Sequence, residues 1–169
     1  MNDRRRATRF GAILVAGSLV VGCATPIRDN FFRQPMIPPD FSFAMTTTGA
    51  EDSTAALDFH TDRLGRATWR TWNRVTRVET NHGEAEVTEA QLDSLWFAAV
   101  DAKFGRIDAG SPPADYGAGS TSAVQRIALT ARGVERVVWR PPGAADVAPI
   151  RKAVLDLVPR DVAAAFTSR

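Results

Sequence analysis

Two carboxylates and an imidazole follow one another at two-residue spacing, at Asp58, His60 and Asp62. In an extended strand this spacing places all three side chains on the same side. Such a set could bind a divalent metal or carry out acid–base catalysis. The same pattern is also typical of the solvent-exposed side of an amphipathic strand whose Leu57 and Phe59 point inward. The sequence offers no fourth ligand, so we predict no metal or cofactor and keep the three residues as catalytic candidates.

A second group of candidates combines tryptophan with arginine, at Trp69, Arg70, Trp72 and Arg74. Both residue types are enriched at binding hot spots, and arginine forms paired hydrogen bonds with phosphate and carboxylate groups. The alternative is an ordinary strand, with tryptophans packed under helices and arginines in solvent. We keep these four residues as candidates for binding an envelope protein or an anionic polymer.

Cys23 is the only cysteine, so the sequence predicts neither an internal disulfide nor a thiol pair that could bind zinc. It follows an arginine-rich start and an apolar run over residues 10–21. A membrane-spanning helix needs about 20 apolar residues, so this run is too short to span. A positive start, a short apolar centre and a small residue at the end are typical of a signal peptide.

The segment Val20-Val21-Gly22-Cys23 resembles the lipobox of bacterial lipoprotein precursors, with Val20 where leucine is usual. The resemblance covers the first 23 residues. It implies a signal peptide over residues 1–22, a diacylglycerol on Cys23, cleavage before it and acylation of the new amine with a fatty acid such as palmitate. Each buried methylene of such chains contributes about 0.8 kcal/mol to membrane binding. A plain secretory signal with a chance cysteine is the alternative.

The resemblance to lipoprotein precursors also implies a cellular location. Residue 24 is alanine, whereas aspartate there usually retains a Gram-negative lipoprotein at the inner membrane. The resemblance therefore implies the outer membrane, facing the periplasm, if the cell is Gram-negative.

The formal net charge of +2 arises before Cys23, where four arginines face a single acid. The remaining chain is close to neutral, which does not indicate a nucleic-acid partner.

Residues 23–40 hold four prolines and no periodic pattern, which predicts an extended tether. Whether part of it lies against the domain stays open. Residues 41–169 are predicted to form a single α+β domain of order β-β-β-α-β-β-α. We expect an antiparallel sheet of about five strands with two helices on one face. This layout loosely resembles small secreted bacterial domains of unknown function, a likeness that implies no activity.

The expected turns and ends come from local sequence signals. We predict a third strand over Arg66–Thr80 with a bulge near Asn73, and turns at Asp62–Gly65, Asn81–Gly83 and Arg132–Gly133. Thr88 and Gln91 predict a capping box that starts the first helix, and Gly105 is expected to end it. Pro149 and Pro159 should mark the start and the end of the second helix.

These observations favour a membrane-anchored envelope lipoprotein that serves as a non-catalytic binding or structural module. The alternative is a small periplasmic hydrolase or metal-dependent enzyme that uses Asp58, His60 and Asp62. Catalytic residues meet in space and need not form a motif, so the sequence keeps both functions open.

Overall fold

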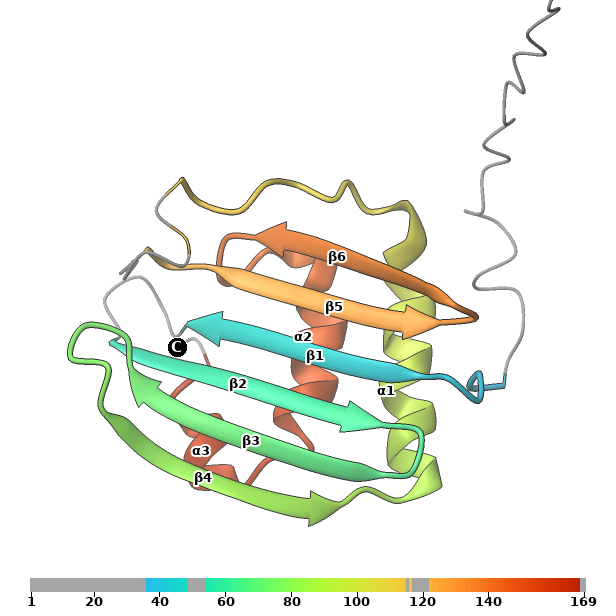
Figure 1. Ribbon diagram of the computed structural model, residues 1–169, viewed down its shortest axis with the longest axis horizontal. Coiled ribbons are helices and arrows are strands. Elements are labelled where there is room, and N and C mark those ends of the chain that lie inside the picture. The colour runs from blue at the N-terminus through green and yellow to red at the C-terminus, as the bar shows by residue number, and fades with distance from the viewer. Residues whose placement is uncertain (1–35, 49–53, 115, 117–121, 168–169) are drawn as a thin grey trace, which may run out of the picture.

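One antiparallel sheet and a layer of helices form the protein in a computed structural model, which describes residues 36–48, 54–114, 116 and 122–167. The six strands lie in the order β4-β3-β2-β1-β5-β6, and the helices cover one face of the sheet (Figure 1). The elements are β1 (Ser42–Thr48), β2 (Ala55–Asp62), β3 (Arg66–Asn73), β4 (Glu79–Glu86), α1 (Glu89–Asp101), the 3-10 helix η1 (Phe104–Arg106), β5 (Gln125–Ala131), β6 (Val134–Arg140), the 3-10 helix η2 (Ala145–Val147), α2 (Ala148–Leu155) and α3 (Arg160–Ala164).

The predicted fold class is confirmed, with one more strand and one more short helix than expected. The difference lies in residues 66–80, which do not form a single strand. The chain turns after Asn73, whose Oδ1 accepts hydrogen bonds from the backbone N–H groups of Val75 (2.9 Å) and Thr76 (3.0 Å). An asparagine side chain that bonds its own backbone two residues on is a common turn former. The predicted turn at Asn81–Gly83 is therefore wrong, because these residues lie inside β4.

Two tight turns are confirmed, and each depends on a backbone conformation that favours glycine. Gly65 has a φ of 76° and follows the β2–β3 turn, where Asp62 Oδ1 accepts from the N–H of Leu64 at 2.9 Å. Arg132 and Gly133 both have positive φ, 54° and 72°, at the β5–β6 hairpin. Two consecutive positive values are typical of the turn whose twist matches the flanking strands.

Helix α1 begins where the sequence predicts. Gln91 N–H donates to Thr88 Oγ1 at 3.3 Å, and Thr88 N–H donates to Gln91 Oε1 at 2.9 Å, which completes the capping box. The predicted end at Gly105 is wrong, because α1 stops at Asp101 and Lys103 takes the left-handed conformation with a φ of 52°. Gly105 lies in η1 instead.

The core lies between the sheet and the helices. Phe43, Met45 and Phe59 project into it from β1 and β2, and Leu95 and Trp96 project from α1. All of them are at least 98% buried. Apolar burial of this kind is the main stabilising contribution to such a fold.

The last residues of the predicted tether pack on the domain. Ile37 belongs to the core cluster, and Phe41 N–H donates to the carbonyl oxygen of Pro38 at 3.1 Å. Cys23 and the lipobox lie outside the described residues. Within the described residues, no helix is both long and apolar enough to cross a membrane.

Candidate functional site

The sheet has one face that no described helix covers, and we call it the open face (Figure 1). Strand alternation decides which side chains reach it. Leu57, Phe59 and Thr61 of β2 are buried under the helices, so Asp58, His60 and Asp62 lie on the open face. The predicted shared side of these three residues is therefore confirmed.

The two carboxylates of this group are engaged in separate interactions. Asp58 accepts hydrogen bonds from Thr46 Oγ1 at 2.7 Å and from Arg70 Nη2 at 2.9 Å. Asp62 accepts from the backbone of the β2–β3 turn and forms an ion pair with Arg66 Nη2 at 3.4 Å. His60 is exposed between them. Among the described residues, no three histidine, cysteine or acidic side chains lie close enough together to hold a metal ion.

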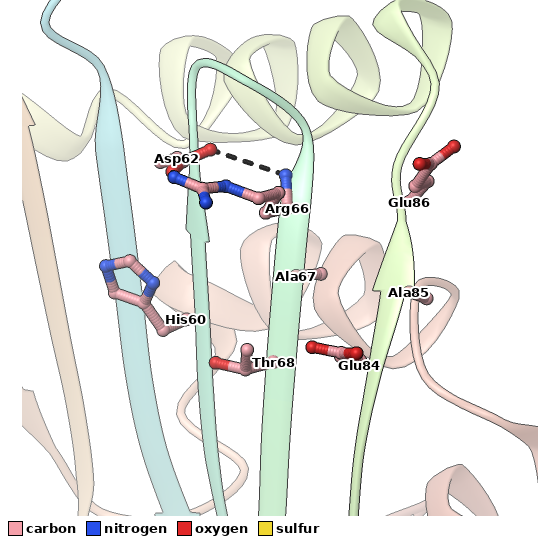
Figure 2. Close-up of a pocket in the computed structure, with 8 residues that line it drawn as sticks. All are labelled: His60, Asp62, Arg66, Ala67, Thr68, Glu84, Ala85 and Glu86. Atoms are coloured by element: carbon pink, nitrogen blue, oxygen red, sulfur yellow. Dashed lines mark hydrogen bonds and ion pairs between the residues drawn. The ribbon is translucent and has the colours of Figure 1, made fainter.

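A hollow of about 600 Å³, with His60 on one side of its lining, lies at the β3–β4 side of the open face (Figure 2). Its charged lining residues are Asp62, Arg66, Glu84 and Glu86. Figure 2 shows Arg66 turned back onto Asp62, while Glu84 and Glu86 project from β4. This part of the open face is therefore acidic, and its one arginine is paired.

A second hollow, of about 210 Å³, lies at the other end of the open face and has the opposite character. Its lining residues are Thr46, Thr48, Ala56, Asp58, Trp72, Arg74, Arg77, Tyr116, Ser122 and Val124. We call it the arginine–tryptophan pocket. The Arg70 guanidinium lies over the Trp72 ring beside it, 5.3 Å from the ring centroid. The hydrogen bond to Asp58 raises the pKa of Arg70 above its usual range, so this cation is firmly charged.

The open face continues across β5 and β6 with the same residue types. Thr46 pairs with Arg126, and Arg126 pairs with Trp139. The Arg126 guanidinium lies 5.8 Å from the centroid of the Trp139 ring, and Tyr116 meets that ring edge-on with centroids 4.4 Å apart. One row of side chains therefore carries an arginine over a tryptophan at each of its two ends.

Arg126, Tyr116 and Trp139 were not among the residues predicted from the sequence. The alternation of β6 places Trp139 on the same side as the charged Glu135, and this pattern could have indicated that Trp139 faces away from the core. However, the register between β1, β5 and β6 places Arg126 and Trp139 in the same row as Asp58 and Thr46, and that register comes only from the structure.

The four predicted tryptophan and arginine candidates do not all share one face. Trp72 and Arg74 line the arginine–tryptophan pocket, and Arg70 lies beside it. Trp69 points to the other side, where it packs against the core, and its buried Nε1 has no hydrogen-bond partner in the part of the chain that the structure describes. The structure therefore separates Trp69 from the other three.

Comparison with known proteins adds no further assignment. The chain matches no protein-family model, and no curated protein shows significant sequence similarity to it.

Proposed function

We propose that this protein is a lipid-anchored component of the bacterial envelope that binds an anionic partner on the open face of its sheet. The anchor is the lipid expected on Cys23, and the residue after it favours the outer membrane, facing the periplasm, in a Gram-negative cell. The observation that supports binding is the row of two arginine–tryptophan pairs on a face that no described helix covers.

The chemistry of this row favours an anion with some apolar surface. Trp72, Tyr116 and Trp139 offer large rigid areas, and Arg70 and Arg126 offer directed N–H groups for carboxylate or phosphate oxygens. An arginine that rests on an aromatic ring has already lost much of its freedom, so binding costs it less entropy. Anionic cell-wall polymers and acidic segments of envelope proteins both carry such groups.

A catalytic function that uses Asp58, His60 and Asp62 has less support. Catalysis requires groups that converge on one reacting atom. Asp58 is bound to Thr46 and Arg70, whereas Asp62 is bound to its own turn and to Arg66. A binding module therefore agrees better with the contacts observed.

The anchor is tested by Cys23→Ser in cells supplied with labelled fatty acid. We expect the label to be absent from the variant and present on the wild type, since the sulfur is the acceptor of the diacylglycerol. Replacement of Thr25 by serine serves as the matched control and should leave the label unchanged. Labelled lipid on the Cys23→Ser protein would contradict the anchor assignment.

The binding face is tested with a photoreactive benzoylphenylalanine at Tyr116, which is 40% exposed on the open face. The matched control carries the same probe at Phe97, which is 43% exposed on helix α1. We expect light-dependent crosslinks in intact cells from position 116 and not from 97. Arg126→Glu combined with Trp72→Ala should remove them. Equal crosslinking from both positions, or crosslinks that survive both substitutions, would rule out this face.

A further inference from the structure

Arg151 of α2 is a buried cation, and none of the acidic residues that the structure describes forms an ion pair with it. Its residue exposure is only 9%. Its Nη2 donates to the carbonyl oxygen of Phe166, while its buried Nε has no hydrogen-bond partner within residues 36–48, 54–114, 116 and 122–167. Loss of hydration lowers the pKa of Arg151, but an arginine keeps its charge inside proteins. An uncompensated buried charge is unfavourable unless something pairs with it.

A purely structural role explains the hydrogen bond that Arg151 makes but not its positive charge. The bond to Phe166 fastens the segment that follows α3 to α2 and uses one of the five N–H groups of a guanidinium. A neutral donor could make that single bond without the cost of burying a charge. The positive charge itself therefore remains without an explanation in the described fold.

Arg151 also lines a groove of about 430 Å³ between α2 and α3. Most of the lining is apolar, from Ala144, Ala148, Leu155, Ala163 and Phe166. The other cation of the groove, Lys152, forms an ion pair with Asp156 at 2.7 Å. The volume falls in the range of small-molecule sites, which are mostly apolar with a few oriented polar groups. Arg151 is thus the one charge of the groove left without a counter-ion among the described residues.

We propose that this groove binds a small amphiphile with one anionic head group, held by Arg151, and a short alkyl chain that lies against Leu155, Ala163 and Phe166. The head group is a carboxylate or a phosphate monoester, because both accept paired hydrogen bonds from a guanidinium. The site belongs to the helical layer, on the side of the sheet opposite the open face, so it does not depend on the function proposed above.

The test uses the full chain in an uncharged detergent and follows its melting temperature with hexanoate, hexyl phosphate and hexanol. Ligands that bind only the folded state stabilise it by mass action. We expect hexanoate or hexyl phosphate to raise the melting temperature by about 2 °C or more at saturation. The uncharged hexanol, with the same chain, should leave it unchanged. The response to the two anions identifies the preferred head group.

Three variants separate specific binding from general effects. Arg151→Met should abolish the rise, and Ala163→Leu should weaken it by filling the groove while keeping Arg151. Arg160→Met is the control, because Arg160 is exposed and does not line the groove. If Arg151→Met fails to fold, Ala163→Leu still decides the matter. The proposal is overturned if hexanol acts like the anions, if no anion shifts the wild type, or if the folded groove variants respond fully.

Discussion

Gly83 and Trp69 lie opposite each other on neighbouring strands, and the Trp69 ring occupies the space that a side chain at position 83 would need. A Cβ atom at position 83 would lie 2.3 Å from Cζ2 of the Trp69 ring. The tryptophan therefore covers the glycine of an edge strand, an arrangement known to stabilise glycine in sheets. This contact explains how a residue typical of turns can lie within β4.

We predict that Gly83→Ala lowers the free energy of unfolding by about 1–3 kcal/mol, the usual cost of overpacking. Urea denaturation measures it. In a Trp69→Leu background the loss should be much smaller, since residues in contact are not additive. Glu84→Ala, at an exposed neighbouring position, is the control. Equal losses from Gly83→Ala in both backgrounds would show that the ring does not occupy this space.

Asp58 lies between Thr46 and Arg70, and its side chain is 37% exposed. We predict that Asp58→Asn changes the free energy of unfolding by less than about 1 kcal/mol, because partly exposed ion pairs contribute little. It should nevertheless increase crosslinking from Tyr116, since Arg70 no longer pairs with Asp58 and has more N–H groups for an anionic partner. Glu135→Gln is the matched control, because Glu135 Oε1 lies 4.0 Å from Arg126 Nη2, farther than Asp58 Oδ2 lies from Arg70 Nη2. Reduced crosslinking in Asp58→Asn would contradict an anionic partner.

At the scale of elements, the sequence predicted the features that depend on residues close together in the chain. The capping box of α1 and the turns at Gly65 and Gly133 depend on residues within four positions, so the sequence was sufficient. The break between β3 and β4 could be predicted only in part, because the sequence near Asn73 indicates a bulge within one strand and not a turn between two. Strand-forming residues continue past Asn73, and Asn81–Gly83 has the composition of a turn, whereas in the structure Gly83 pairs with Trp69.

The candidate site shows the same division. Arg70 and Trp72 could be selected because they share one strand and one side. Arg126 and Trp139 join them only through the pairing of β1 with β5 and of β5 with β6. Such contacts between distant segments leave no local signal in the sequence. This is why only half of the row of arginine–tryptophan pairs could be anticipated.

Helix α1 supplies a test of the core, because Leu95 is 99% buried under the sheet. We predict that Leu95→Ala lowers the free energy of unfolding by about 2–5 kcal/mol through lost contacts and a residual cavity. The neighbouring Ser94 is exposed, and Ser94→Ala should change it by less than about 1 kcal/mol. Chemical denaturation measures both variants. Similar small losses would mean that this side of α1 does not face the core.

At the scale of the whole molecule, Asp40 fastens the start of the domain to the β5–β6 hairpin. Its carboxylate accepts from the N–H of Gly133 at 2.5 Å and of Arg132 at 2.7 Å. These bonds, first from Gly133 and then from Arg132, lower the pKa of Asp40 below its ordinary value of 3.8. Hydrogen bonds to a charged form favour that form. The point where the chain enters the sheet is therefore held by a carboxylate.

The sign of the pH dependence follows from the lowered pKa. A carboxyl group whose pKa is lower in the folded state stabilises the fold above its unfolded value and loses this contribution as the pH falls below 3.8. We predict that Asp40→Asn has a lower melting temperature than the wild type at pH 6. Near pH 3 the difference between their melting temperatures should be smaller. Asp101→Asn, at an exposed position at the end of α1, is the control. A constant difference at both pH values would contradict this assignment.

The central position of β1 has a mechanical consequence. The chain enters the sheet at β1, which pairs along its length with β2 on one side and with β5 on the other. Tension between a membrane anchor before this strand and a partner held on the sheet would pull along β1. The hydrogen bonds of β1 with β2 and with β5 would then be loaded together in shear. They would have to break at the same time, whereas an edge strand pulled away from the sheet loses its hydrogen bonds one after another. The protein should therefore resist pulling on the chain before β1 far better than pulling on its edge strand β4, a difference that single-molecule force measurements can detect.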